Sequence, residues 1–344
     1  MKNPPDNTAL HRFEPVRIGV IGLGNFGRLH ALTLAGLAES QLVAMVARRQ
    51  ASVDTVNEQL EKADRPAVRG WLDLNTAIEE ANAEAWVVAS STVSHVPIAR
   101  TLLEAKQTVL LEKPIAEDIK EAQTLEPLVK ADSSNLMLGH IVLFNSEYRQ
   151  VQEQAKDRGP IVFVDCARHR PRTTMAALPG ESPFHLTMVH DLYAVLALLN
   201  RAEPCRFSAH AHHMADRECD LAAAVLQWPD GTVASFKASF LTPDGFAEDG
   251  FDRMEVFGTD WMARIETNPR PLRVWDTKAR WPMQLEISAD PLAPTGMLAE
   301  QLRCFCRVVR GLEPVPIGAT FQDAMQVERW LDRLVRRSDE AMKR

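Results

Sequence analysis

The stretch VRIGVIGLGNFGR, residues 16–28, decides the fold. An apolar run ends at Gly22, and Gly22, Gly24 and Gly27 then follow the pattern G-x-G-x-x-G ahead of a helical stretch. The first glycine permits a tight turn, the second lets a pyrophosphate approach the backbone, and the third lets helix and strand pack closely. Because N–H groups at a helix N-terminus attract anions, the pattern predicts a dinucleotide site. The residues expected to line it are Gly22, Leu23, Gly24, Asn25, Phe26 and Gly27.

The composition is typical of a soluble enzyme. The chain has 344 residues, enough for two domains, and 46% of them are hydrophobic, without an apolar run long enough to cross a membrane. Residues 1–7 are polar and proline-rich and predict a loose tail rather than a signal peptide. The net charge of −7 argues against a nucleic-acid partner. Five cysteines without C-x-x-C spacing fit reduced thiols, so we expect a cytoplasmic protein.

The first half of the chain alternates strand and helix patterns. Apolar runs typical of buried strands occupy residues 41–46, 85–90, 108–111 and 135–140, and helical patterns occupy residues 53–62, 95–105 and 117–130. Strands that alternate with helices form right-handed βαβ units around a parallel sheet. With the glycine pattern in the first crossover, they predict an α/β fold that begins with a Rossmann dinucleotide-binding domain over residues 14–140.

The second half has the pattern of a large open, mainly antiparallel sheet. Strand patterns occur at residues 161–168, 221–228, 232–240, 253–258 and 262–266, and they include two hairpins. Ser182 and Pro183 are typical of a helix start, as N-cap and first helical residue, and we expect this helix to reach residue 200. A last helix at residues 321–337 is expected to pack back on the body of the protein. These patterns predict an α+β domain over residues 141–344.

The chain carries further motifs in a recognisable order. They are the segment VVASSTVSH at residues 87–95, Glu112-Lys113-Pro114, Gly139-His140 with Phe144-Asn145, and His190. In combination with the glycine pattern they resemble the Gfo/Idh/MocA oxidoreductases, the group of glucose–fructose oxidoreductase and inositol dehydrogenase. The resemblance runs from about Val16 to Ser338.

The resemblance implies a nicotinamide cofactor and hydride transfer to or from a carbinol or carbonyl carbon, mostly of sugars, cyclitols and related small molecules. It also implies further cofactor contacts from Ser90, Ser91, His95, Glu112 and Lys113. A homodimer or homotetramer assembled through the C-terminal sheet is expected on the same ground.

Lys113 is the first candidate catalytic residue. It follows the strand pattern at 108–111, at the carboxyl edge of the predicted parallel sheet, where ligands bind in open α/β folds. Oxidation of a carbinol needs a proton acceptor and the reverse reaction needs a donor, and a lysine can be either or can polarise the oxygen as a cation. From position alone, a surface loop lysine is an equal explanation; the resemblance favours the catalytic role.

His190 is the second candidate, because histidine titrates near neutral pH and can shuttle a proton. Members of the family usually carry an aspartate four residues earlier on the same helix face, and here this position is Leu186. By the 3.6-residue repeat, Thr187 is the only polar neighbour on that face, whereas His185 and Asp191 point elsewhere. We therefore expect a histidine without an orienting carboxylate, with Thr187 as a further substrate contact. The alternative is a helix histidine capped by a hydroxyl or water.

The end of the second strand indicates which cofactor is preferred. NAD-preferring Rossmann sites have an acidic residue there that binds the ribose hydroxyls. Here Ala47 takes that position, and Arg48 and Arg49 follow it. No carboxylate would repel a 2′-phosphate, and two guanidinium groups could bind it. We expect NADP, with NAD and an exposed basic turn as the alternative.

Two other clusters of polar residues are weaker candidates for a functional site. Arg168 and Arg170 alternate along a strand and share one sheet face, where they could bind an acidic or phosphorylated substrate or form surface ion pairs. Three histidines within residues 210–213, near Cys219, match no metal-ligand spacing, so no metal site is predicted.

Three functions stay open. The first is an NADP-dependent dehydrogenase or reductase. The second is a hydrolase or lyase that uses tightly bound NAD transiently and shows no net turnover of added cofactor. The third is a cofactor-sensing regulator without chemistry. The presence of Lys113 favours an enzyme, whereas Leu186 in place of an aspartate keeps the regulator open.

Overall fold

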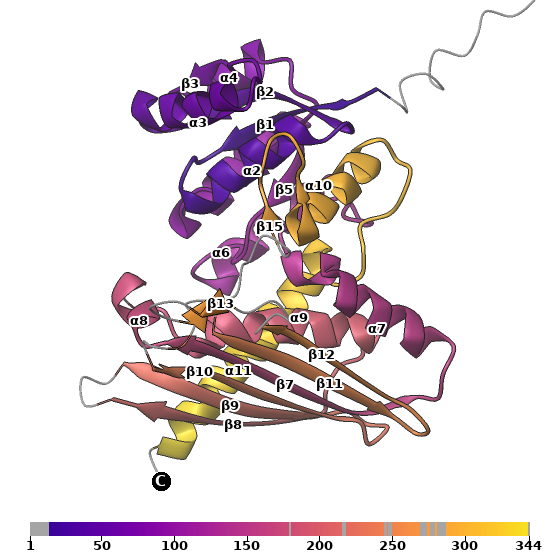
Figure 1. Cartoon of the computed structure of the whole chain (residues 1–344). Coiled ribbons are helices and arrows are strands. Elements are labelled where there is room, and N and C mark those ends of the chain that lie inside the picture. The colour runs from indigo at the N-terminus through magenta and orange to yellow at the C-terminus, as the bar shows by residue number, and fades with distance from the viewer. Residues whose placement is uncertain are drawn as a thin grey trace, which may run out of the picture. The chain divides into compact units, whose positions relative to one another are not determined.

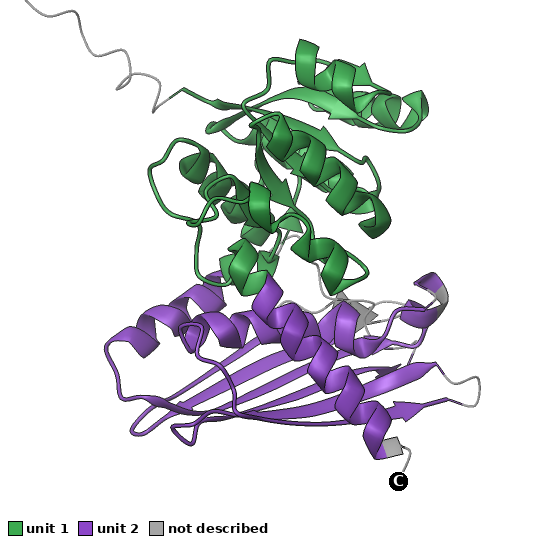
Figure 2. Ribbon diagram, turned by 180° about the vertical axis from the view of Figure 1, so that it is seen from behind, with its two compact units in different colours: residues 1–144, 284–324 green, residues 145–283, 325–344 purple. Residues whose placement is uncertain are grey.

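The computed structural model describes residues 14–178, 180–214, 218–243, 246, 250–268, 274–275, 279–280 and 287–342. The chain forms two compact units, which Figure 2 shows in different colours. Unit 1 consists of residues 1–144 and 284–324, and unit 2 of residues 145–283 and 325–344. Unit 1 is therefore discontinuous in sequence, whereas the sequence analysis assigned the stretch 284–324 to the second domain. The tail expected at residues 1–7 lies outside the described residues.

Unit 1 is built on a parallel sheet. Its strands are β1 (Val16–Ile21), β2 (Ser40–Val46), β3 (Gly70–Trp71), β4 (Ala85–Val88), β5 (Thr108–Leu111) and β6 (Leu136–Leu138). They lie in the order β3-β2-β1-β4-β5-β6, and every neighbouring pair is parallel (Figure 1). All four residues of β4 are buried, as expected for a strand covered by helices on both faces. The predicted Rossmann sheet is confirmed.

Helical segments connect these strands, and one more, η3, follows β6. They are α2 (Asn25–Gly36), α3 (Gln50–Lys62), α4 (Leu74–Glu80), α5 (His95–Glu104), α6 (Ile119–Gln123), and the 3₁₀ turns η1 (Thr92–Ser94), η2 (Glu126–Leu128) and η3 (Ile141–Phe144). The continuous helix predicted for residues 117–130 is wrong, because α6 ends at Gln123. Pro127 in η2 has no N–H to donate, and in an α-helix its ring would clash with the Gln123 carbonyl.

The second stretch of unit 1 packs against the first. It contains β15 (Ile287–Ser288) and α10 (Gly296–Val309), which contacts η3 and α2. At the edge of the parallel sheet, the N–H of Leu138 donates to the Ala319 carbonyl at 2.8 Å, and Met137 forms an antiparallel bridge with Thr320. Residues near 320 thus pair with the outer side of β6.

Unit 2 is built on a mixed sheet. Its strands are β7 (Ile161–Pro171), β8 (Arg206–His213), β9 (Cys219–Gln227), β10 (Val233–Thr242), β11 (Phe251–Gly258) and β12 (Met262–Asn268), and two short strands, β13 (Val274–Trp275) and β14 (Ala279–Arg280), form a separate pair. The order is β12-β11-β7-β10-β9-β8, and only the β7–β10 pair is parallel among the described residues of this sheet. The mainly antiparallel sheet and both predicted hairpins are confirmed, and β8 is an additional edge strand.

Helices cover one face of this sheet (Figures 1 and 2). The helices of unit 2 are α7 (Ser146–Lys156), α8 (Thr173–Ala177), the π-helical turn η4 (Phe184–Met188), α9 (Val189–Leu198) and the greater part of α11 (Phe321–Met342), which is longer than predicted. Along β10, Phe236 and Phe240 are buried, whereas Lys237 and Leu241 are exposed. This alternation is the pattern of a sheet with one covered and one open face. No helix within the described ranges is long and apolar enough to cross a membrane.

A buried histidine lies at the end of the parallel sheet. His140 is 3% exposed, and its Nδ1 donates to the Gly318 carbonyl. Burial lowers the pKa of His140 from 6.5 to about 4, and the Gly318 carbonyl and the Glu112 carboxylate oppose this shift only in part. The folded protein therefore holds this imidazole neutral.

This histidine predicts a loss of stability in mild acid. A histidine whose pKa is lowered by folding stabilises the protein fully above its unfolded pKa of 6.5, and this contribution is lost as the pH falls toward 4. A pKa difference of this size corresponds to about 3 kcal/mol. We expect the free energy of unfolding, measured by urea denaturation at pH 7 and pH 4.5, to fall less in His140→Asn, which can still donate to Gly318, than in the wild type. The same fall in both proteins would show that another group causes the acid sensitivity.

Candidate active site

The glycine-rich turn between β1 and α2 has the geometry of a dinucleotide site. Gly22 has a φ of +85°, and its N–H donates to the Val46 carbonyl at 2.9 Å. A Cβ on Gly22 would lie 2.5 Å from the Ser90 Cα, and one on Gly27 would lie 1.8 Å from the Gly22 carbonyl oxygen. A Cβ on Gly24, by contrast, would meet no atom within 4 Å. The space over Gly24 is open, so the residues present fit a pyrophosphate that approaches the backbone here.

The predicted serines lie beside this turn. β1 and β4 are neighbours, with β2 and β3 on one side and β5 and β6 on the other, so the strand order reverses between them. Ser90 and Ser91 follow β4, and Ser94 joins them: its Oγ donates to the Ser90 Oγ at 2.8 Å and lies 3.2 Å from the Ser91 Oγ. Ligands of open α/β sheets bind at such a reversal point. The structure thus brings the glycine turn and both serines together.

The basic pair lies at the end of β2. Ala47 is buried, whereas Arg48 and Arg49 are exposed. Arg49 precedes the first residue of α3. Within the part of the chain that the structure describes, no carboxylate forms an ion pair with either guanidinium group. Both arginines are therefore available to an anion at this edge of the sheet.

His95 connects two segments of the predicted cofactor site. It is 2% exposed, with Nδ1 2.7 Å from the Pro114 carbonyl oxygen and Nε2 3.1 Å from the Ser90 carbonyl oxygen. Its side chain therefore links the end of β4 to the segment that follows β5. Through this contact, Ser90 and the residues around Lys113 are held near one another.

Glu112 pairs with a histidine that the sequence analysis missed. Its Oε1 lies 2.8 Å from Nε2 of His30 on α2, and both side chains are buried. A Cβ on Gly139 would lie 2.7 Å from the Glu112 carboxyl group, so a side chain at this position would displace the carboxylate. The buried pair connects the segment after β5 to α2, the helix that follows the glycine-rich turn. The His30 ring also meets the Phe26 ring edge to face, with centroids 5.1 Å apart. No spacing in the sequence connects His30 with Glu112, which lies 82 residues away.

Lys113 lies at the carboxyl edge of the parallel sheet, where it was predicted. It follows Glu112, whose N–H donates to the Val88 carbonyl at 2.9 Å, and it is half-buried. Its positive charge acts on His140, where it contributes to the lowered pKa of that imidazole. An amine at this edge can exchange a proton with a ligand or stabilise a developing negative charge.

In unit 2, the helix that carries His190 starts with a π-helical turn. The Val189 N–H donates to the Phe184 carbonyl, five residues earlier, rather than four. The regular 3.6-residue repeat used to place Leu186 and His185 around His190 therefore does not hold in this turn, because the wider turn rotates the preceding side chains. The helix starts where it was predicted: Pro183 is its first helical residue, and the Ser182 carbonyl accepts from the N–H groups of His185 and Leu186 at 3.1 and 2.9 Å. The Ser182 Oγ lies 2.9 Å from the His185 Nδ1.

His190 contacts a buried tyrosine. Its Nδ1 lies 2.7 Å from the hydroxyl oxygen of Tyr193, and the two rings meet edge to face with centroids 5.6 Å apart. Tyr193 is fully buried and His190 is half-buried. Thr187 is buried, and its hydroxyl donates to the Pro183 carbonyl at 2.9 Å.

Arg168 and Arg170 lie in buried or half-buried ion pairs. Arg168 is 2.9 Å from Asp191 and 3.2 Å from Asp252, and Arg170 binds both carboxylate oxygens of Asp252 at 2.6 and 3.0 Å. Burial lowers the pKa of Arg168, but the two carboxylates outweigh it and raise this pKa above its usual range. For Asp191, burial raises the pKa to about 6, although Arg168 opposes the shift. The two arginines were expected either to bind an acidic or phosphorylated substrate or to form surface ion pairs. The geometry favours ion pairs, although these lie below the surface.

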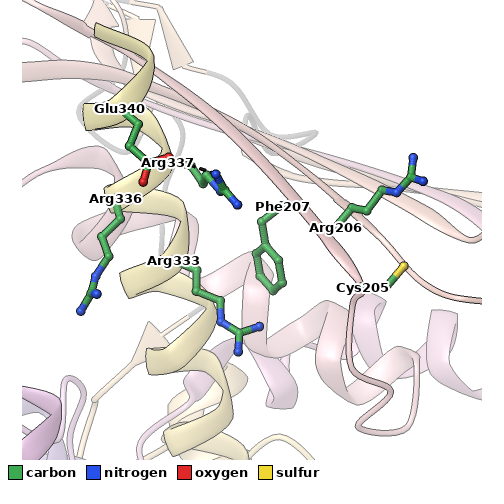
Figure 3. Close-up of a pocket in the computed structure, with 7 residues that line it drawn as sticks. All are labelled: Cys205, Arg206, Phe207, Arg333, Arg336, Arg337 and Glu340. Atoms are coloured by element: carbon green, nitrogen blue, oxygen red, sulfur yellow. Dashed lines mark hydrogen bonds and ion pairs between the residues drawn. The ribbon is translucent and has the colours of Figure 1, made fainter. Parts of the chain in front are cut away.

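The remaining polar clusters do not extend this site. His212 Nδ1 lies 2.6 Å from the buried Asp220, and among the residues the structure describes no three His, Cys, Asp or Glu side chains could hold a metal ion. A surface pocket of about 580 Å³ lies between β8 and the last turns of α11 (Figure 3). Arginines surround Phe207 there, and the Arg333 guanidinium lies 5.2 Å from its ring centre. No predicted site residue lines this pocket.

Two family descriptions match consecutive parts of the sequence. Residues 16–140 match the oxidoreductase family with an NAD-binding Rossmann fold, and residues 134–264 match the Gfo/Idh/MocA C-terminal domain. The chain belongs to the Gfo/Idh/MocA oxidoreductases. Its cofactor is accordingly a nicotinamide dinucleotide, and the open space over Gly24 fits that group.

Individual relatives cover most of the chain. UDP-N-acetylglucosamine 3-dehydrogenase of Acidithiobacillus ferrooxidans is 25% identical over 92% of this chain and 99% of its own. Myo-inositol 2-dehydrogenase of Thermotoga maritima is 28% identical over 71% of this chain and 73% of its own. The crystal structure of scyllo-inositol dehydrogenase from Lactobacillus casei with bound NAD(H) and scyllo-inositol covers 95% of this chain and 98% of its own, with a TM-score of 0.78 at 21% identity. This last similarity shows that the fold is shared.

Two alanine substitutions separate cofactor binding from folding. In Gly24→Ala the added methyl group enters open space, so we expect an unchanged melting temperature but at least about tenfold weaker binding of the nicotinamide dinucleotide, because the pyrophosphate can no longer approach. In Gly27→Ala the methyl group meets the Gly22 carbonyl, so we expect about 1–3 kcal/mol of destabilisation. Calorimetric titration and thermal unfolding measure both effects. Full dinucleotide affinity in Gly24→Ala would mean that the pyrophosphate does not approach this residue.

Proposed function

We propose that this oxidoreductase transfers a hydride between a nicotinamide cofactor and the carbinol or carbonyl carbon of a sugar, cyclitol or related polar substrate. The observation that carries the proposal is the position of Lys113. It follows β5 at the carboxyl edge of the sheet, and His95 ties the segment after it to the serine loop beside the glycine turn. A proton-exchanging amine next to a dinucleotide site is the arrangement that such a reaction requires.

The bound nicotinamide would supply or accept the hydride. Lys113 would donate a proton to the carbonyl oxygen during reduction and accept one from the hydroxyl during oxidation. As an ammonium group it would also stabilise the negative charge that develops on that oxygen. The Glu112–His30 pair would keep the backbone next to Lys113 in place, since both partners are buried.

We propose that His190 contacts the substrate from its own unit. The imidazole is half-buried, and its Nδ1 is engaged by Tyr193, so the proposed contact is made by the other ring nitrogen. Arg168 and Arg170 are assigned no substrate contact, because Asp191 and Asp252 bind their guanidinium groups.

The proposed substrate class rests on the relatives and on one residue that differs from the family's usual pattern. The relatives named above are dehydrogenases of inositol and of UDP-N-acetylglucosamine, which supports cyclitols, sugars and nucleotide sugars as candidates. In the sequence, Leu186 takes the position at which the family usually has an aspartate, and an apolar side chain cannot bind a substrate hydroxyl. We therefore propose a substrate of this class that does not need a carboxylate partner at that position.

A substrate panel tests the function. Polyols, sugar acids and nucleotide sugars are incubated with the protein, and NADPH production or consumption is followed by absorbance. We expect at least one compound to be turned over, and Lys113→Ala to lower kcat about 100-fold while leaving the dissociation constant of NADPH nearly unchanged.

Other outcomes of this panel point to other functions. Cofactor that remains bound through purification, with no net turnover, would indicate the hydrolase or lyase. NADPH binding without any turnover of the panel or of a glycoside set would indicate the regulator. A Lys113→Ala variant that turns over substrate at the wild-type rate would remove Lys113 from the mechanism.

We propose NADP as the preferred cofactor. The support is local: Ala47 takes the place of the acidic residue, and the exposed Arg48 and Arg49 can bind a 2′-phosphate. NAD is the alternative. It would be preferred if the two guanidinium groups did not reach the ribose.

Replacement of both arginines measures this preference. We expect the wild type to bind NADPH more tightly than NADH, and Arg48→Ala with Arg49→Ala to remove most of that difference, about 1–3 kcal/mol for charge-assisted hydrogen bonds. NADH affinity should stay within about twofold, because NADH lacks the phosphate. Titration by intrinsic fluorescence gives all four dissociation constants. Equal affinities for both cofactors in the wild type would contradict the NADP proposal.

A further inference from the structure

We propose that Tyr193 is a positioning residue: its hydroxyl orients the imidazole of His190 and fixes which ring nitrogen carries the proton. This inference rests on the proposed contact between His190 and the substrate. It assigns a function to a residue that the sequence analysis did not consider.

The contact is short and its surroundings are rigid. The Tyr193 hydroxyl oxygen lies 2.7 Å from the His190 Nδ1, and the rings meet edge to face at 78°. The two residues are three apart on α9, so their side chains share one face of the helix. Tyr193 is fully buried, as are the residues on either side of it in α9. The phenol ring cannot turn away without disturbing the core, so the hydroxyl is a fixed point for the imidazole.

The chemistry of the two partners favours one direction for this hydrogen bond. A phenol hydroxyl is a stronger hydrogen-bond donor than a neutral imidazole N–H, and the bare imidazole nitrogen is the stronger acceptor. Tyr193 would therefore donate and Nδ1 accept. A neutral imidazole that accepts at Nδ1 carries its N–H at Nε2.

The chemical consequence is that His190 and Lys113 have different roles. A histidine with its proton at Nε2 donates a hydrogen bond to a substrate oxygen and thereby orients and polarises it. A carboxylate partner, being an acceptor only, would instead place the N–H on Nδ1 and favour the protonated imidazole. With a hydroxyl partner, His190 acts as a hydrogen-bond donor, and the proton of the reaction is left to Lys113.

Nitrogen NMR tests the contact without a substrate. The full-length protein is labelled with ¹⁵N-histidine, and the His190 resonances are identified by their loss in His190→Asn. We expect an Nε2–H tautomer at mildly alkaline pH and a downfield shift of the Nδ1 resonance in Tyr193→Phe, because a bare ring nitrogen loses its hydrogen-bond donor. An Nδ1 resonance that stays unchanged in Tyr193→Phe would overturn the inference.

Tyr148 provides the matched control. It is the other of the two tyrosines in the chain, it is fully buried, and its hydroxyl donates to the Ala194 carbonyl at 2.7 Å. Tyr148→Phe thus removes a comparable hydroxyl from the same core without touching His190. We expect both variants to lose thermal stability and only Tyr193→Phe to change the His190 spectrum. An equal spectral change in both would mean that the core, and not the Tyr193 hydroxyl, sets the tautomer.

Kinetics separates positioning from a purely structural role. With the substrate found in the panel, Tyr193→Phe should lower kcat about 10-fold with unchanged NADPH binding, and it should have no further effect in a His190→Asn background. A loss that adds fully to that of His190→Asn would overturn the inference, because Tyr193 would then act independently. If His190→Asn itself has no effect, the proposed substrate contact of His190 fails, and the NMR result still decides whether Tyr193 orients the ring.

Discussion

The structure depends on a close approach between backbone segments that only glycine permits. The carbonyl of Gly22 lies where a Cβ of Gly27 would be, and the backbone at Ser90 lies where a Cβ of Gly22 would be. The first turn of α2, the end of β1 and the end of β4 consequently meet without side chains between them. This contact places the N-terminus of α2 and the serine loop at the point where the strand order reverses, and the rest of unit 1 is arranged around it.

Buried polar contacts hold the segments around this glycine contact together. The Glu112–His30 pair and the bridging imidazole of His95 connect segments that follow β1, β4 and β5. Buried polar groups without partners are costly, so each contact favours one arrangement of these segments. In unit 2 the Arg168, Asp191 and Asp252 cluster has the same effect near His190. In both units, a buried carboxylate is the sequence neighbour of a residue proposed to act on substrate: Glu112 precedes Lys113, and Asp191 follows His190.

The sequence predicted those features that depend on local patterns. The parallel sheet followed from alternating strand and helix patterns, and the hairpin around residues 229–231 followed from its turn residues. β8 was missed because its sequence RFSAHAHH alternates alanine with histidine and has little apolar character at the sheet edge. The π-helical turn was missed because no residue type signals an i→i+5 bond. His30 and Glu112 are 82 residues apart, and a pair formed only by tertiary folding has no periodicity to reveal it.

The discontinuity of unit 1 has a consequence for how the protein is made. A ribosome that adds about 5–20 residues per second releases β6 well before the segment near residue 320 that pairs with it, a delay on the order of ten seconds or more. During this interval the whole central insertion of residues 145–283 emerges while the outer side of β6 lacks its final partner. An unpaired strand edge is a site of aggregation. The nascent chain is therefore most vulnerable in the middle of its synthesis, and the domain that starts first is completed almost last.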